Sequence, residues 1–228
     1  MMFKHISYNF PKLIKESVGE ARFYTTPDGK KYSSVTTVIA EHNKAGLDKW
    51  RKRIGTEKAS TITKRAATRG TSVHAAVESL LRNEDTSKLN LMPHSKILYV
   101  NLKKELILRV SEVHAIETPL FSHDLRLAGT TDLVAKYDDT LSIVDFKTSL
   151  KPKKKEWVGG YYMQGVAYSH MFEEMTGKTI DQIIILIGVD GLNYCQTFKL
   201  TKNEYGPWLD KLILYRDKYE ESRGSTLF

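Results

Sequence analysis

The sequence predicts an α/β fold, in which a central mixed β-sheet with an antiparallel three-strand meander is flanked by helices and preceded by an N-terminal hairpin and a helical region. Three observations lead to this prediction. Residues 47–110 have mainly helical patterning, residues 113–148 have the alternation of strands, and residues 180–189 form the continuous apolar run of a buried strand. Helices and strands in such an order are typical of an α/β domain.

The first half of the chain is expected to form a hairpin followed by helices. Pro27, Asp28 and Gly29 supply the hairpin turn, and Gly55 and Gly70 mark breaks or close contacts between helices. The expected elements are strands over residues 22–26 and 31–34, a short helix opened by residues 34–39, a helical segment over 47–82 and a helix over 97–110.

The second half is expected to form most of the sheet. Residues 138–140 make a turn that sets the strands beside it antiparallel, and Gly177 ends a helix. The expected elements are strands over 113–121, 125–137 and 141–148, a helix over 157–176, strands over 180–189 and 193–200, and a helix over 202–221. We expect one domain over residues 1–228, consisting of an N-terminal extension (1–45), a helical region that carries His74 (46–111) and an α/β core (112–228).

The composition favours a soluble, intracellular protein with a polyanionic partner. The 228 residues carry a formal net charge of +8 and the pI is near 9.3, although ribosomal and membrane-surface proteins share this balance. Cys195 is the single cysteine, which excludes disulfides within the chain and cysteine-based zinc or iron–sulfur sites. No stretch approaches the ~20 apolar residues of a membrane span, and we expect the cytoplasm of a bacterial or phage-infected cell rather than an organelle.

Two carboxylates and a lysine are predicted to converge at one edge of the sheet. Asp145 and Lys147 end an apolar strand and share one face of it, while Phe146 points to the other face. If the hairpin is symmetric, the partner of Asp145 is residue 133 or 134, which brings Asp132 close across the ladder. Two adjacent carboxylates destabilise each other unless a cation binds them, and Mg²⁺ or Mn²⁺ suits oxygen ligands.

A metal ion bound at this edge of the sheet would enable the site to catalyse a reaction. It could bind a phosphate oxygen, activate water and stabilise a leaving oxygen, so the hypothesis is a site that cleaves phosphodiesters. Lys147 would then hold the attacking water or neutralise charge that develops on the phosphate. Taken alone, the Asp-x-Lys pattern more often belongs to an exposed hairpin with a surface ion pair.

Helical spacing places other candidate residues beside this edge. Gly70, His74 and Glu78 lie four apart on one stripe, and His74 could offer a ring nitrogen to the metal, although a lone histidine on such a helix is usually structural. Gln164 and Tyr168 lie one turn apart and could hold the strand that carries Lys147 or bind a nucleotide, or belong to an ordinary amphipathic helix.

Glu117 lies on the strand before Asp132. It could bind the metal or support a residue that does, and a solvated strand face is an equally good explanation of this residue.

Four short motifs resemble, in order, those of the RecB-like nucleases of the PD-(D/E)XK superfamily. They are Gly-x-x-x-His-x-x-x-Glu at 70–78, Gly-x-x-Asp at 129–132, Asp-x-Lys at 145–147 and Gln-x-x-x-Tyr at 164–168. Residue 131 is Thr where the superfamily's named pattern has Pro, a proline that RecB-like members commonly lack. Segments 34–38 and 145–149 further resemble phage exonucleases similar to the mitochondrial genome-maintenance exonuclease.

The resemblance implies a restriction-endonuclease-like fold and a divalent-metal-dependent deoxyribonuclease. His74, Asp132 and Asp145 would bind Mg²⁺ or Mn²⁺ together with the carbonyl oxygen of Phe146, and Lys147 would be catalytic. Glu78 and Gln164 would support the site, and Tyr168 would buttress it.

The expected partner is DNA. The expected phosphate contacts are Arg69, before His74, and the lysines that follow the catalytic strand, Lys151, Lys153, Lys154 and Lys155. Several aromatic residues could stack on unpaired bases or pack in the core, namely Trp50, Trp157, Tyr161 and Tyr162.

The narrower resemblance favours an exonuclease that acts on single-stranded DNA or DNA ends. The alternatives are an endonuclease or flap nuclease with the same site, a non-catalytic DNA-binding module and an RNA-processing protein.

Overall fold

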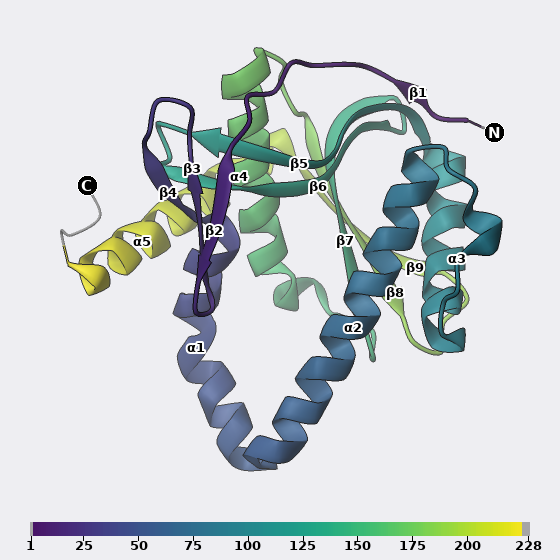
Figure 1. Cartoon of the computed structure of the whole chain (residues 1–228), viewed down its shortest axis with the longest axis horizontal. Helices are drawn as coiled ribbons and strands as arrows, with labels where there is room; N and C mark the ends of the chain where they lie inside the picture. The colour runs from purple at the N-terminus through teal and green to yellow at the C-terminus, as the bar shows by residue number, and fades with distance from the viewer. Residues whose placement is uncertain (1, 225–228) are drawn as a thin grey trace.

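The computed structural model describes residues 2–224, and Figure 1 shows its arrangement. The strands over these residues are β1 (Lys4–His5), β2 (Ile14–Val18), β3 (Ala21–Thr25), β4 (Lys31–Ser34), β5 (Val110–Ser122), β6 (Leu127–Tyr137), β7 (Thr140–Ser149), β8 (Gln182–Val189) and β9 (Cys195–Thr201). The helices are α1 (Val35–Ile54), α2 (Thr56–Leu81), α3 (Pro93–Arg109), α4 (Gly159–Thr176) and α5 (Tyr205–Arg223), with short 3₁₀ turns η1 (Thr86–Lys88), η2 (Lys155–Trp157) and η3 (Lys202–Glu204).

The described strands form one mixed sheet, which confirms the predicted α/β class. Seven of them follow the order β2-β3-β4-β6-β7-β8-β9, and β5 pairs with β6 and β1. Strands β5, β6 and β7 are the predicted antiparallel meander, whereas β7 and β8 are parallel because α4 connects them as a crossover. The order of elements along the chain follows the prediction from residue 93 onward.

The turn between β6 and β7 determines the register beneath the candidate site. Asp138 and Asp139 have φ values of 49° and 57°, as a two-residue hairpin turn requires. Leu133 therefore pairs with Val144, and Asp145 lies one position further, opposite Asp132. The predicted partner of Asp145, residue 133 or 134, was wrong because the prediction assumed a three-residue turn.

The N-terminal third differs most from the prediction. The helix that Ser34 caps is 20 residues long rather than short, and the side chain of Ser34 accepts a hydrogen bond from the N–H of Thr37. Gly55 separates α1 from α2 with φ at 89°, which confirms the break there, but α2 continues through Gly70 without interruption. Strands β1 and β2 were not predicted, since their residues are mostly exposed and lack apolar alternation.

Two apolar layers cover opposite faces of the sheet. On β8, Ile183 and Ile185 pack with α1, α4 and α5, while Ile184 and Leu186 pack with α2 and α3. In the N-terminal extension, β4 pairs in parallel with β6, which joins this segment to the same sheet. We propose on this basis that the chain forms a single domain.

Helices α1 and α2 extend from the body as two arms that meet at Gly55, as Figure 1 shows. Among the described helices, none is both long and apolar enough to cross a membrane.

Candidate active site

Strand β7 carries a buried ion pair. The ammonium of Lys147 lies 2.6 Å from Oδ1 and 2.5 Å from Oδ2 of Asp145, whose side chain is only 2% exposed. Gln164, on α4, donates a hydrogen bond from Nε2 to Oδ1 of Asp145 at 3.0 Å. The carboxylate is thus held from the sheet and from the helix, and Phe146, which points to the other face, packs with the α2 and α3 layer.

The electrostatics of this pair indicate which partner keeps a proton. Burial raises the pKa of Asp145 to about 6, although the positive charge of Lys147 opposes the rise. Burial lowers the pKa of Lys147, but the negative charges of Asp145 and Asp132 outweigh burial and raise that pKa overall. Lys147 therefore stays protonated, as a cation that donates a hydrogen bond to Asp145.

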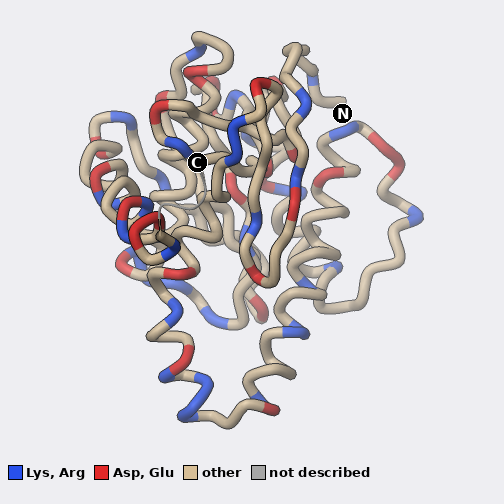
Figure 2. Tube along the Cα trace, turned by 60° about the vertical axis from the view of Figure 1, so that its left-hand side comes forward, with Lys and Arg blue, Asp and Glu red and all other residues tan. Residues whose placement is uncertain are grey.

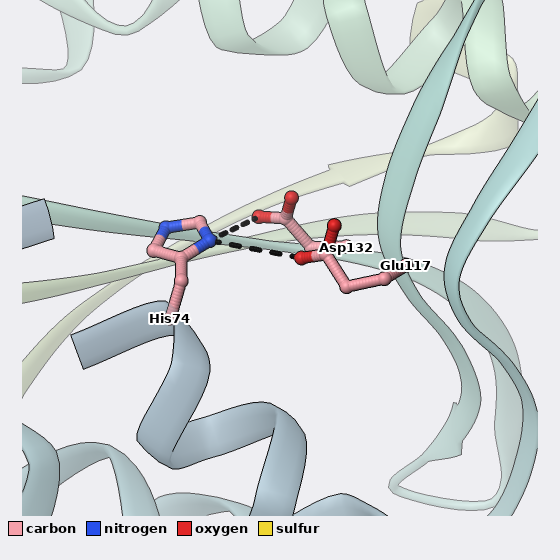
Figure 3. Close-up of side chains that lie close together, drawn as sticks. All are labelled: His74, Glu117 and Asp132. Carbon is pink, nitrogen blue, oxygen red and sulfur yellow. Dashed lines mark ion pairs between the residues drawn. The ribbon is translucent and has the colours of Figure 1, made fainter. Parts of the chain in front are cut away.

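Three potential metal ligands converge at one place, as Figure 3 shows. His74 comes from α2, Glu117 from β5 and Asp132 from β6. Nδ1 of His74 lies 3.9 Å from Oε1 of Glu117 and 3.8 Å from Oδ2 of Asp132, and one atom from each residue lies within 4.8 Å of the others. Two carboxylates and an imidazole at this spacing fit a divalent cation.

Glu117 reaches this cluster through an unusual backbone conformation. Its φ is 46°, which costs a non-glycine residue ~1–2 kcal/mol. In the β5–β6 ladder, Ile116 pairs with Leu133 and Thr118 with Thr131, so Glu117 and Asp132 face each other between these pairs. The strain coincides with convergence of the carboxylates, which is where such strain is often functional. No local pattern distinguishes Glu117 from a solvated strand residue, because its role depends on this conformation.

The peptide groups of Phe146 position two members of the cluster. Its N–H donates a hydrogen bond to Oδ2 of Asp132 at 2.8 Å. Its carbonyl oxygen lies 2.8 Å from Nε2 of His74, and since a carbonyl only accepts, Nε2 carries the hydrogen and Nδ1 faces the carboxylates. This carbonyl therefore orients His74, and its role as a ligand of the ion, which the resemblance implied, stays a prediction.

The charge state of His74 depends on the two acids. Burial lowers its pKa, but the carboxylate of Glu117, 3.9 Å from Nδ1, and the negative charge of Asp132 outweigh burial and raise the pKa overall. Binding a cation through Nδ1 requires the neutral ring, so an ion would displace a proton there.

Gly129 and Tyr168 form a close contact behind Asp132. A methyl group on Gly129 would lie 2.7 Å from Cε1 and 2.8 Å from Oη of Tyr168, whose side chain is almost fully buried. Burial also raises the pKa of the Tyr168 phenol, which therefore stays neutral. The glycine of the Gly-x-x-Asp motif thus lets the Tyr168 ring pack against β6 three residues before Asp132.

Two predicted site residues make other contacts. Glu78 accepts hydrogen bonds from Arg82 at 2.9 and 3.0 Å, and no hydrogen bond or ion pair within residues 2–224 joins it to the cluster. Arg69 is buried, and its Nε donates to Oγ1 of Thr148 at 3.4 Å, so it packs at the end of β7 rather than on an open surface. The expectation for Glu78 came from the family resemblance and that for Arg69 from its position before His74, and neither determines the neighbour that a side chain meets.

Basic residues lie in two parts of the chain that adjoin elements of the site, the segment after β7 and the arms of α1 and α2. The lysines after β7 are exposed except for Lys153, which is half-buried and whose N–H donates to Oε1 of Gln196 at 2.7 Å. This hydrogen bond connects the segment of residues 151–155 to β9. Figure 2 shows further Lys and Arg residues along the two helical arms, and they include Lys49, Arg51, Lys52, Arg53, Lys58, Lys64 and Arg65.

A comparison with known families agrees with this geometry. The profile of the PD-(D/E)XK nuclease superfamily matches residues 46–221, a range that includes the cluster and the Asp145–Lys147 pair. The chain therefore belongs to the PD-(D/E)XK nuclease superfamily, which confirms the resemblance drawn from the four motifs.

Individual relatives match shorter parts of the chain. Mitochondrial genome maintenance exonuclease 1 of Homo sapiens is 31% identical over 111 residues, which cover 47% of this chain and 32% of that protein. The Mus musculus protein of the same name is 29% identical over 114 residues, with the same coverage of both chains. The match thus spans about a third of the length of these relatives. A candidate exonuclease from Eubacterium rectale, known from a crystal structure, is 15% identical with a TM-score of 0.47, and the match covers 66% of this chain and 65% of that chain.

Proposed function

We propose that this chain is a Mg²⁺- or Mn²⁺-dependent deoxyribonuclease that acts as an exonuclease on single-stranded DNA or DNA ends. The observation that carries the proposal is the convergence of His74, Glu117 and Asp132 beside the Asp145–Lys147 pair in a member of a nuclease superfamily. The exonuclease part is supported by the relatives, which bear the name of an exonuclease.

The donor set fits the proposed ion. Carboxylate oxygens suit Mg²⁺ and Mn²⁺, and His74, Glu117 and Asp132 would hold the ion, with Asp145 joining them as the resemblance implies. When bound, the ion supplies Lewis-acid polarisation of a phosphate oxygen and a lowered pKa for nearby water.

The protein's own side chains would contribute by offsetting the charge on the phosphate and by orienting the groups around it. The Lys147 ammonium would donate a hydrogen bond to a phosphate oxygen and offset the charge that develops there during hydrolysis. Its Nζ lies 5.1 Å from the ring centre of Tyr161, which limits the positions that the ammonium can take. Gln164 holds the Asp145 carboxylate in one orientation through its 3.0 Å hydrogen bond.

The basic surface supports a nucleic acid substrate. The lysines at 151 and 153–155 directly follow the strand that carries Lys147, and the arms of α1 and α2 carry further positive charge. Binding of phosphates at these positions would release counterions, so affinity should fall steeply with salt. We propose that Arg69, although buried, contributes to this surface at the edge of the site.

A cleavage assay tests the proposal. An end-labelled single strand should be degraded in Mg²⁺ or Mn²⁺ and left intact in EDTA. Asp132→Asn and Lys147→Ala should each lose activity by about 100-fold or more, because the first weakens a proposed ligand of the ion and the second removes the positive charge placed at the phosphate. Asp124→Asn is the matched control, because Asp124 is an exposed acid just before β6. Full activity in a folded Asp132→Asn or Lys147→Ala variant would refute the assignment.

The form of the substrate separates the remaining possibilities. An exonuclease leaves covalently closed single-stranded circles intact, whereas an endonuclease cuts them. A flap substrate tests for a flap nuclease, and an RNA strand of the same sequence tests for an RNA-processing enzyme. Binding to DNA without cleavage in either metal would identify a non-catalytic DNA-binding module instead.

A further inference from the structure

A cleft of about 500 Å³ opens beside the candidate active site, between α1, the start of α4, and α5. Its volume lies in the range of ligand sites, about 300–1,000 Å³. Four aromatic rings line it: Trp157 just before α4, Tyr161 on α4, and Trp208 and Tyr215 on α5. An aromatic lining of this kind, reached by solvent, can accept flat apolar groups.

The cleft and the active site share side chains. Tyr161 and Gln164 both line the cleft. Gln164 also donates to Asp145 at 3.0 Å, and the ammonium of Lys147 lies 5.1 Å from the Tyr161 ring centre. A strand in the cleft would therefore lie next to the residues that are proposed to act on its phosphate.

Close packing holds one wall of the cleft in place. A methyl group on Gly159 would lie 2.8 Å from Cζ3 of Trp208, so the indole packs directly on the first turn of α4. Behind it, Tyr162 is almost fully buried at 5.5 Å from the Trp208 ring, so of the two alternatives that the sequence left open, base stacking and core packing, Tyr162 takes the second. The Trp208 indole is thus held in position by Gly159 on one side and by the buried ring of Tyr162 on another.

Lysine ammonium groups lie over three of the rings, of which Trp157 is exposed, Trp208 half-buried and Tyr215 buried. Nζ of Lys154 is 5.6 Å from the centre of Trp157, and Nζ of Lys211 is 5.8 Å from Trp208 and 5.7 Å from Tyr215. Both lysines are exposed, and Trp157 is 58% exposed, so these groups can rearrange around a ligand. Aromatic rings with nearby cations match an unpaired nucleic acid strand, which presents base faces and phosphates together.

We propose that this cleft binds unpaired nucleobases by stacking, with Trp157 as the main exposed ring and with Lys154 and Lys211 on the flanking phosphates. The inference rests on the proposed nuclease function and names the surface that would make the site favour single strands. In a duplex the bases stack on each other, so their faces are not free to stack on Trp157. Tyr161 would then lie between the stacked bases and the phosphate at Lys147.

Binding without cleavage tests the inference. In EDTA, the fluorescence anisotropy of a labelled oligothymidylate gives its affinity for the intact chain. Trp157→Ala should weaken binding by about 5- to 150-fold, which corresponds to the ~1–3 kcal/mol of one stacked base. Tyr194→Ala is the matched control, because Tyr194 is equally exposed at 58% but lies outside the cleft; its affinity should stay within about twofold of the parent's. Trp157→Phe should retain most of the affinity, because it keeps a ring.

An oligonucleotide with central abasic sites separates stacking from phosphate binding. The parent should bind it more weakly than the intact strand, whereas Trp157→Ala should bind the two strands almost equally. Equal affinities of the parent and Trp157→Ala for the intact strand, or of the parent for both strands, would overturn the inference. Failure of the nuclease function would be seen separately, as the absence of metal-dependent cleavage by the parent.

Discussion

Gly129→Ala tests whether the packing behind Asp132 holds the active site in place. The added methyl group would lie 2.7 Å from Cε1 and 2.8 Å from Oη of Tyr168. Nonbonded carbon atoms prefer ~3.5–4.0 Å, so the overlap with the ring is about 1 Å. Because Tyr168 is only 2% exposed, the ring cannot move toward solvent, and β6 or α4 has to shift.

The expected loss of stability follows from two opposing effects. Overpacking a buried site costs ~1–3 kcal/mol, and replacing glycine by alanine within a strand returns up to ~1 kcal/mol. The free energy of unfolding should therefore fall by about 1–2 kcal/mol, which lowers the melting temperature of a chain of this size by about 2–8 °C. Cleavage should fall as well, because the shift moves Asp132, three residues along β6.

Calorimetry and the cleavage assay measure these two effects. Gly46→Ala is the matched control, because Gly46 lies inside α1 and the added methyl group would meet nothing within 4 Å beyond its chain neighbours and the surrounding helix backbone. That variant should be more stable than the parent by about 0.5–1 kcal/mol. If Gly129→Ala melts at the parent temperature and cleaves at the parent rate, the Tyr168 contact does not hold Asp132 in place.

Four further predictions address the cluster, its support and the core. Glu117→Gly should abolish cleavage while leaving the metal-free melting temperature unchanged or higher, because glycine accepts the positive φ; a lower melting temperature would contradict the strain at this position. Gln164→Met should lower the cleavage rate about tenfold, since it removes the hydrogen bond to Asp145 but keeps the volume, and a parent-like rate would show that this bond is dispensable. Mg²⁺ or Mn²⁺ at 100 times its Kd should raise the melting temperature of the parent by about 5–10 °C and that of Asp132→Asn by far less; equal shifts would place the ion elsewhere. Burial raises the pKa of Cys195 to about 12, so iodoacetamide at pH 8 should alkylate it slowly in the folded chain and rapidly in guanidinium chloride; fast reaction of the folded chain would show an accessible thiolate.

The periodicity of the sequence was sufficient to predict which face of a single strand each side chain occupies. Side chains alternate along a strand, so the sequence alone placed Asp145 and Lys147 on one face and Phe146 on the other, and the structure has the same arrangement. The order of the four short motifs was likewise sufficient to recognise the superfamily. The turn between β6 and β7 was located correctly, although its length was not.

Tertiary structure alone decided which side chains meet across elements. Glu117 joins His74 and Asp132 because the register of β5 on β6 and a positive φ direct it there. Glu78 pairs with Arg82 and Arg69 packs against Thr148, contacts that the sequence did not predict when it gave Glu78 a supporting role and Arg69 a phosphate contact. Spacing along a helix or strand determines which face a side chain occupies. The neighbour that it meets depends on pairing and packing energies summed over segments distant in the chain, which no local pattern contains.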